Sequence, residues 1–306
     1  IRLSTPVAAL TADDAGRIDG VTLEGGETIA APRGVILAAG GFPWDLERRK
    51  RVFAHHPGAA DHLTMAPAGN TGDGLAMAEH RGAAVIEDYA TPAAWFPVSE
   101  VPRRNAAPDR FIHFADRGKP GVIAVTPQGH RFVDEGTSYG GFVEAMIDTA
   151  EGDTPRSAWL ICDSDTLHRY GLGAARPWPV PHGGHLASGY LKRGRTLAEL
   201  AGKIGVPAET LTATVARFNA QAEAGRDTDH HRAEGSISRY NGDLSRPGNP
   251  GLAPLKRGPF YAVETRPGDI GTFAGLATDA HARVLDTSGG VLAGLYAVGN
   301  DQASVF

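Results

Sequence analysis

The chain has 306 residues, of which 42% are hydrophobic and 21% charged, so it carries enough apolar side chains for one large or two mid-sized globular domains and is not a disordered protein. Its formal net charge is −5 and its Lys and Arg residues are scattered, which excludes nucleic acid and membrane surfaces as expected partners. The single cysteine, Cys162, excludes an intrachain disulfide, and without a long apolar run or a signal-peptide pattern we expect a cytoplasmic protein with no membrane span.

The chain begins with short runs of alternating or β-branched residues. Residues 1–10, 18–23 and 28–31 are such runs, separated by acidic or glycine-rich turns, and they predict a β-meander. The first run starts at Ile1 itself, and the chain stops at Phe306 just after a Gly-Asn-Asp turn. We therefore expect this sequence to be a fragment.

A continuous apolar segment follows the meander. Residues 33–42 have the pattern of a fully buried strand in a parallel sheet, and they end in paired glycines that allow the backbone to approach another group closely. Residues 70–74 (Asn-Thr-Gly-Asp-Gly) precede a helical stretch at 75–82. Their amides are expected at a helix N-terminus, where anions are favoured.

The pattern changes to mixed strands and helices between residues 99 and 257. Helices are predicted at 140–150, 196–204 and 209–222, with a Gly/Pro-rich stretch at 171–189. From residue 258 the first pattern returns, with strands predicted at 258–263, 282–285 and 294–298 and a glycine-rich loop after the first of them. We predict an α/β fold in which residues 1–98 and 258–306 form one interrupted nucleotide-binding domain and residues 99–257 form an inserted domain.

Three segments, 35–42, 69–84 and 294–301, together resemble the fumarate reductase and 3-ketosteroid Δ1-dehydrogenase superfamily of flavoproteins. Their order and spacing match over nearly the whole chain. The resemblance implies FAD as cofactor, an interrupted Rossmann-like FAD-binding domain, an inserted α+β cap, and substrate held between the two. The superfamily also has a first βαβ unit with Gly-x-Gly-x-x-Gly and a later segment that covers the flavin. Neither has a counterpart in this sequence, which therefore resembles a copy truncated at both ends.

The resemblance also implies which residues hold FAD. They are Val7, Ala39, Gly40, Gly41, Asp73, Asn300 and Asp301. Val7 matches a backbone contact to adenine, although ordinary strand packing explains it equally well. Asp73 is alternatively a helix N-cap. Asn300 matches a residue that hydrogen-bonds the ribityl chain, and the sharp turn is expected to expose both Asn300 and Asp301. No metal site is expected, because the His pairs lack metal-ligand spacing.

Residues 128–139 resemble the superfamily's Gly-x-Arg-Phe-x-Asn-Glu segment, which enters the active site. Four residues past the Glu, fumarate reductases have an arginine and ketosteroid dehydrogenases a tyrosine; this chain has Tyr139. Residues 271–275 also lack the histidine with which fumarate reductases grip a carboxylate. We therefore expect an FAD-dependent oxidoreductase that desaturates a 3-ketosteroid-like cyclic ketone, with an electron acceptor as second partner.

Tyr139 is the expected catalytic base. Desaturation beside a carbonyl removes an acidified α-hydrogen as a proton and the β-hydrogen as hydride, and a phenol serves as the base if its pKa, ordinarily about 10, is lowered, for example by a second tyrosine. Alternatively, the Tyr139 ring only packs between domains. Two further functions stay open: reduction of an unsaturated carboxylate, and an inactive fragment or subunit that binds no FAD alone.

Overall fold

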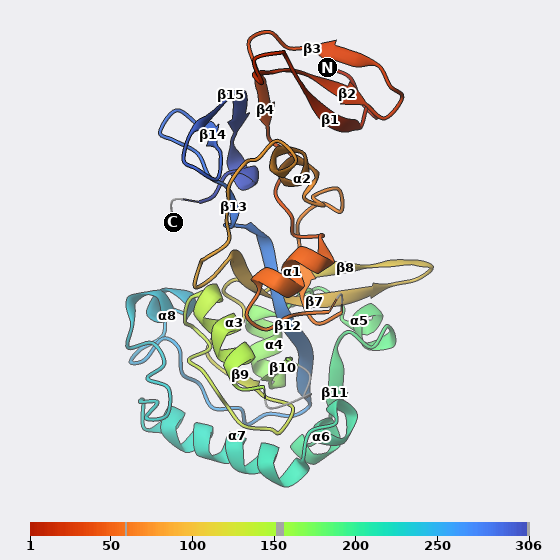
Figure 1. The fold of residues 1–306 in the computed structure, drawn as a ribbon. Coiled ribbons are helices and arrows are strands. Elements are labelled where there is room, and N and C mark those ends of the chain that lie inside the picture. The colour runs from red at the N-terminus through yellow and green to blue at the C-terminus, as the bar shows by residue number, and fades with distance from the viewer. Residues whose placement is uncertain (59, 151–155, 305–306) are drawn as a thin grey trace. The chain divides into compact units, whose positions relative to one another are not determined.

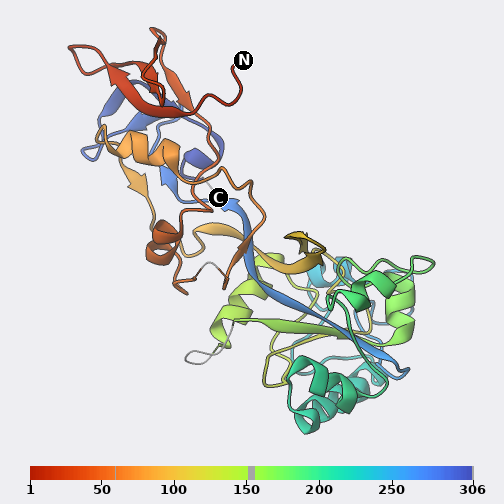
Figure 2. The same cartoon turned by 90° about the vertical axis from the view of Figure 1, so that its right-hand side faces the viewer.

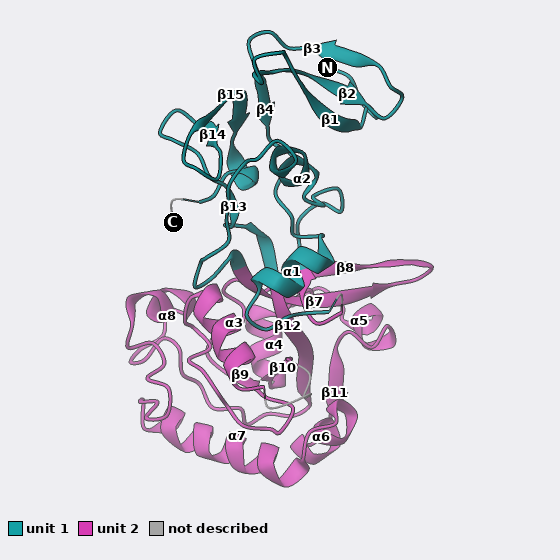
Figure 3. Cartoon of the chain, in the orientation of Figure 1, with its two compact units in different colours: residues 1–59, 64–94, 269–306 teal, residues 60–63, 95–268 magenta. Residues whose placement is uncertain are grey.

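The structure is a computed structural model that describes residues 1–58, 60–150 and 156–304. The chain divides into two compact units (Figure 3). Unit 1 comprises residues 1–59, 64–94 and 269–306, and unit 2 comprises residues 60–63 and 95–268. The sequence predicted boundaries at 98/99 and 257/258, whereas the units divide at 94/95 and 268/269. Among the described residues, no helix combines the length and hydropathy that crossing a bilayer requires.

Unit 1 contains mostly short strands (Figure 1). Its elements in chain order are β1 (Val7–Ala12), β2 (Ile18–Leu23), β3 (Thr28–Ala30), β4 (Val35–Leu37), α1 (Leu46–Val52), α2 (Asp73–Glu79), β6 (Val85–Ile86), β13 (Gly275–Leu276), β14 (Arg283–Leu285), β15 (Val291–Ala297) and the 3₁₀ turn η1 (Gly299–Asp301). Three further strands, β5 (Leu63–Thr64), β7 (Ala93–Arg103) and β12 (Phe260–Thr272), have residues in both units.

The predicted β-meander is present as the antiparallel sheet β1-β2-β3. Leu10, Ile18 and Leu23 are buried beneath it, as alternation along half-buried strands requires. The first strand begins at Val7 and not at Ile1. Pro6, which has no N–H to donate to a ladder, directly precedes it.

The strand predicted at 33–42 is β4, which pairs in parallel with β15 in the sheet order β14-β15-β4. The expectation of a fully buried strand was wrong, because Ile36 is 64% exposed and only Leu37 is buried. Within the described residues β4 lies at the end of this order, so one of its edges is unpaired. An apolar run alone does not distinguish such a strand from a central one.

Unit 2 is built on a sheet with the path β8-β7-β12-β10-β9, to which β5 and β11 add by pairing with β12. Its remaining elements are β8 (Ala106–Ile112), β9 (Val122–Val125), α3 (Tyr139–Asp148), β10 (Ala158–Cys162), α4 (Ser164–Tyr170), α5 (Gly183–Ala187), β11 (Lys192–Gly194), α6 (Leu197–Ile204), α7 (Ala208–Glu223) and α8 (Ser236–Asn241). Helices were predicted at 140–150, 196–204 and 209–222, and α3, α6 and α7 occupy these places.

Both faces of the unit 2 sheet carry a hydrophobic core. Alternate residues of a strand point to opposite faces, so Val122 and Ala124 join a cluster with Phe142 of α3, whereas Ile123 joins a cluster with Phe218 of α7. Figures 1 and 2 show α6 and α7 together on one side of this unit. Each large apolar side chain buried in this way stabilises the fold by roughly 1.5–3 kcal/mol.

Strand β12 is longer than the sequence predicted. A strand ending at residue 263 and a glycine-rich loop were expected, but β12 continues through Pro267 and Gly268 to Thr272. Gly268 has no room for a side chain, because a Cβ there would overlap the carbonyl oxygen of Leu63 and the side chain of Val98. Close strand packing, and not a turn, accounts for this glycine.

Candidate functional site

A pocket of about 710 Å³ in unit 1 is bounded by β1, β4 and α2. It brings together Val7, Ala39 and Asp73, three of the residues expected at FAD, and all three are exposed. The walls are otherwise largely apolar, with Ile36 and Met77 among them. An apolar slot with a carboxylate at its edge fits a flat base attached to a hydroxylated sugar, which is the adenosine part of FAD.

Asp73 is not the N-cap of α2. The cap is Gly72, which takes φ 85° and offers no side chain, and Asp73 is the first residue of the helix. Its carboxylate accepts a hydrogen bond from Thr71 Oγ1 at 3.0 Å and remains exposed at the pocket. The N-cap explanation for Asp73 is therefore wrong, and its contact with a cofactor stays a prediction.

The paired glycines after β4 are required by the protein's own packing. Gly40 and Gly41 take φ 93° and 74°, where residues with a side chain are strained. A Cβ on Gly40 would overlap the side chain of Asn70, which donates to Gly40 O at 3.1 Å, and a Cβ on Gly41 would overlap Thr272 Oγ1. Both glycines are therefore explained by close contacts with other residues of the chain, and their contact with FAD stays a prediction.

Asp301 joins the glycine loop to η1. Its carboxylate is fully buried and accepts hydrogen bonds from the Gly41 amide at 2.9 Å and from the Ala39 amide. The expectation that the turn exposes both Asn300 and Asp301 was wrong, because only Asn300 is exposed. The 3₁₀ turn directs these consecutive side chains differently, and Asp301 fixes the loop at 39–41 by charge-assisted hydrogen bonds.

A second pocket in unit 1, of about 360 Å³, contains Asn300 and Thr272. Asn300 Nδ2 donates to Thr272 O at 3.0 Å. Thr272 Oγ1 is buried without a hydrogen-bond partner among the described residues, so this hydroxyl has an unused donor and acceptor. This pocket fits a polar, hydroxylated group such as a ribityl chain.

Tyr139 lies in unit 2 as the first residue of α3. Ser138 is the N-cap, and its Oγ accepts from the Gly141 amide at 3.1 Å. The Tyr139 ring stacks on Phe96 and meets Phe114 edge-on, and 44% of the residue is exposed. Its ring contacts within the described part of the chain are these phenylalanines, so the second tyrosine that the sequence analysis invoked is not among them.

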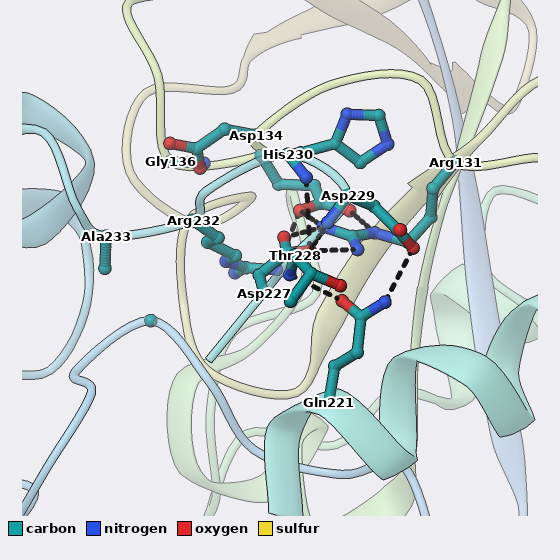
Figure 4. Close-up of polar contacts among 12 residues, drawn as sticks. Arg131, Asp134, Gly136, Gln221, Asp227, Thr228, Asp229, His230, Arg232 and Ala233 are labelled. Atoms are coloured by element: carbon teal, nitrogen blue, oxygen red, sulfur yellow. Dashed lines mark hydrogen bonds and ion pairs between the residues drawn. The ribbon is translucent and has the colours of Figure 1, made fainter. Parts of the chain in front are cut away.

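The segment before Tyr139 takes part in a buried ionic cluster that the sequence did not predict. Glu135 is fully buried and pairs with Arg131 at 2.8 Å and Arg232 at 3.0 Å. Arg131 also pairs with Asp227 at 2.8 Å, as Figure 4 shows. Burial acts to raise the pKa of Glu135, but the two guanidinium groups outweigh it and hold that pKa below its ordinary value. The carboxylate is therefore ionised at neutral pH.

A second buried polar group of unit 2 contains another tyrosine. His113 Nδ1 lies 2.7 Å from Asp116, and His113 Nε2 lies 3.0 Å from Ser99 Oγ. Ser99 in turn contacts the Tyr190 hydroxyl at 2.9 Å, beside a cavity of about 250 Å³. Burial raises the pKa of Tyr190 to about 12. Its phenol stays protonated at neutral pH, so Tyr190 is a poor candidate for a base.

Within residues 1–58, 60–150 and 156–304, no group of His, Cys, Asp and Glu side chains is placed to hold a metal ion. The His182 ring instead bonds Arg176 O at 2.7 Å. His230 is half-buried and lies in the loop after α7 that Figure 4 shows.

Comparisons with known proteins match the whole chain. A family model described as an FAD binding domain matches residues 1–306. A curated relative, 4-oxocyclohex-2-ene-1-carboxylate 5-dehydrogenase of Sinomonas cyclohexanicum, is 41% identical in an alignment of 306 positions that covers 99% of this chain and 52% of the relative. The 3-oxosteroid 1-dehydrogenase of Mycobacterium tuberculosis is 37% identical in an alignment of 284 positions that covers 91% of this chain and 49% of that one.

A solved structure is similar as well. The crystal structure of 3-ketosteroid Δ1-dehydrogenase from Sterolibacterium denitrificans in complex with 1,4-androstadiene-3,17-dione matches with a TM-score of 0.87 and 35% identity, covering 98% of this chain and 54% of that chain. The chain thus spans about half the length of the relatives that it matches. The likeness confirms the predicted fold class.

Proposed function

Because the chain belongs to the family of FAD-binding domains, we propose that the protein is an FAD-dependent oxidoreductase that desaturates a cyclic ketone beside its carbonyl group. Membership of this family confirms the superfamily and the cofactor that the sequence predicted. The relatives named above are dehydrogenases whose names specify an oxo group on a ring, either an oxocyclohexene carboxylate or a 3-oxosteroid. The ring ketone is the feature that these substrates share.

The observation that carries the proposal is the setting of Tyr139. Its phenol stands at the start of a capped helix, nearly half exposed, with its ring supported by Phe96. The described residues make no hydrogen bond to its hydroxyl, so the oxygen is free to meet a substrate. At this accessible position the Tyr139 oxygen can meet the C–H bond of a substrate, and it acts as a base in its phenolate form.

FAD, when bound, supplies the acceptor for the hydride that leaves the β-carbon. As the phenolate, Tyr139 Oη takes the proton from the α-carbon, whose C–H is acidified by the neighbouring carbonyl, and becomes the neutral phenol; the electron pair of that bond becomes part of the new C=C bond. Phe96 and Phe114 place apolar rings beside the phenol, which suits a ring substrate. Tyr139 is the one residue to which we assign a catalytic role.

We assign FAD binding to unit 1 and the cap to unit 2. Val7, Ala39 and Asp73 hold the adenosine part in the larger pocket, and Asn300 binds the ribityl chain in the smaller one. At Gly40 and Gly41, where no side chain intervenes, the backbone lies against the dinucleotide. Asp301 belongs to this site through the loop that it fixes, since its buried carboxylate already binds the amides of Ala39 and Gly41.

The direct test is turnover by the FAD-loaded protein with an artificial electron acceptor. The substrate panel contains a 3-oxosteroid, 4-oxocyclohexanecarboxylate and, as oxidant of the reduced flavoprotein, fumarate. We expect desaturation of at least one ketone and no oxidation by fumarate, and Tyr139→Phe lowers kcat about 100-fold or more while the flavin absorbance bands are kept.

The matched control is Tyr240→Phe, a change at a tyrosine of unit 2 that is 77% exposed. It should leave kcat unchanged. A Tyr139→Phe protein that turns over ketones at the native rate would refute the base assignment, and turnover of fumarate alone would replace the proposed reaction by carboxylate reduction. A protein without flavin bands in the presence of excess FAD would show that this chain does not bind FAD alone.

A further inference from the structure

The guanidinium group of Arg117 is fully buried in unit 2 and holds the backbone that leads into Tyr139. Its Nη1 donates to Glu135 O at 2.5 Å and its Nη2 donates to Thr137 O at 2.8 Å. These carbonyl groups belong to the last turns of chain before α3. One side chain therefore fixes two peptide planes close to the proposed base.

The remaining polar groups of this segment are also held by side chains. Asn241 Nδ2 donates to Gly136 O at 2.9 Å, between the two carbonyls that Arg117 binds. The Gly136 amide donates to Asp134 Oδ1 at 2.8 Å. The carbonyl groups of residues 135, 136 and 137 thus each accept a hydrogen bond from a side chain, so a shift of this backbone would break at least one of these bonds.

Arg117 also binds the chain segment that contains Phe114. Its Nε donates to His113 O at 3.3 Å, and the next residue, Phe114, is the one that meets the Tyr139 ring edge-on. The guanidinium lies 4.9 Å from the centre of the Phe142 ring, which is part of α3. The same group thus links the loop before Tyr139, the helix that carries it and the segment that packs against its ring.

We propose that Arg117 is a positioning residue for Tyr139, a role that rests on the proposed function of Tyr139 as the base. Among the described contacts, Arg117 has none with the side chain of Tyr139. We therefore expect it to act on Tyr139 through the main chain. The rigid fork of a guanidinium suits this task, because it donates to separate carbonyls at fixed angles, whereas a lysine ammonium does not.

The charge of Arg117 is retained at neutral pH. Burial lowers its pKa to about 10, and the carboxylates of Asp116 and Asp134 oppose that change. All of its N–H donors are therefore available under the conditions of an activity assay. Removing the group would leave the carbonyls of Glu135 and Thr137 buried without these partners.

The test is a double-mutant cycle in the FAD-loaded protein with Arg117→Lys, Tyr139→Phe and the double variant. We expect Arg117→Lys to lower kcat about 10-fold or more with little change in KM, because a misplaced base slows proton removal without weakening substrate binding. In the Tyr139→Phe background the same change should have almost no effect on kcat. That loss of effect is a readout that a merely structural role does not produce.

Arg232→Lys is the matched control. Arg232 is equally buried, but its guanidinium donates to the Glu135 carboxylate and to the carbonyls of Arg117, Lys119 and Val122. Among the contacts of the described residues it has none to residues 136–139. It should reduce the melting temperature as Arg117→Lys does and reduce kcat less. If the lysine variants fold poorly, Asn241→Ala frees the Gly136 carbonyl alone and should show the same non-additivity with a smaller fall in kcat.

The outcomes separate the two proposals. Equal fold losses from Arg117→Lys in both backgrounds, or an unchanged kcat, would overturn the positioning role while Tyr139→Phe still identified the base. A Tyr139→Phe protein with native kcat would instead remove the proposed function on which the role rests. Effects of Arg232→Lys on kcat as large as those of Arg117→Lys would also count against a specific role for Arg117.

Discussion

The ring of Tyr139 lies parallel to that of Phe96, with centroids 3.8 Å apart and planes inclined by 12°. Phe96 is 2% exposed and sits in β7, whereas Tyr139 is at the start of α3. The exposed phenol is therefore supported on one face by a strand of the unit 2 sheet. This contact leads to the first prediction.

Phe96→Leu removes the stacking partner and keeps an apolar side chain. Aromatic pairs contribute about 0.5–1.5 kcal/mol beyond burial, so we expect kcat to fall by up to about 10-fold with FAD binding unchanged. Steady-state kinetics and a flavin titration measure this. Phe132→Leu is the control, since Phe132 packs edge-on against Phe142 and not against Tyr139. Equal losses in both variants would mean that the stack has no particular role.

Asp301→Asn replaces a carboxylate that accepts two backbone amides by a group with one acceptor oxygen. Hydrogen bonds to a charged group contribute about 1.5–3 kcal/mol, and the loop at 39–41 loses one of its two. We expect the Kd for FAD to rise about 10-fold or more in an absorbance titration. Asp286→Asn, which alters the exposed turn between β14 and β15, should leave that Kd unchanged. An unaltered Kd in Asp301→Asn would contradict the assignment.

Glu135→Gln leaves Arg131 and Arg232 buried without their shared carboxylate. Breaking a buried pair in this way costs about 3–5 kcal/mol, so urea unfolding at pH 7 should show a loss of that order, and Glu234→Gln, at an exposed site, should show almost none.

The ionisation of Glu135 should also make the free energy of unfolding depend on pH. The pKa of Glu135 is lower in the folded protein than in the unfolded chain, so its ionised form stabilises the fold above the unfolded value of about 4.3, and this contribution is lost as the pH falls below that value. The free energy of unfolding should therefore fall more steeply between pH 5 and pH 3, about one unit either side of that value, in the native protein than in Glu135→Gln. Identical slopes would show that Glu135 does not contribute.

Cys162 is fully buried, and burial raises the pKa of its thiol well above the ordinary value. A thiol without thiolate character or access does not react with a disulfide reagent. We expect no reaction at pH 8, about half a unit below the ordinary thiol pKa, in the native protein, and one thiol per chain after unfolding in guanidinium chloride. Rapid labelling of the native protein would indicate that β10 opens readily.

The sequence predicted the elements whose signals are local. The meander, α6 and α7 follow from alternation or helical periodicity within a few residues, and the structure has all three, although the first strand of the meander begins at Val7 instead of Ile1. The exposure of Ile36 was not predictable in this way, because an apolar run has the same composition at the edge of a sheet as at its centre.

The interior of the candidate site was less predictable. Asn300 and Asp301 are consecutive polar residues of one turn, and only the backbone path decides which of them is buried. Arg232 and Glu135 are 97 residues apart, so their pairing leaves no local pattern. Within that cluster, only the ion pair of Arg131 with Glu135 joins residues close in sequence, since they are four residues apart. Arg117 gave no local signal.

The bonds from Asp301 to residues 39 and 41 close loops of 262 and 260 residues, and β15 pairs with β4 across a similar span. Contacts this distant along the chain form slowly, because a long loop must close before they are made. During synthesis, unit 2 emerges and has its own core before residues near 301 exist. The glycine loop therefore acquires its buried carboxylate only after unit 2 has been synthesised.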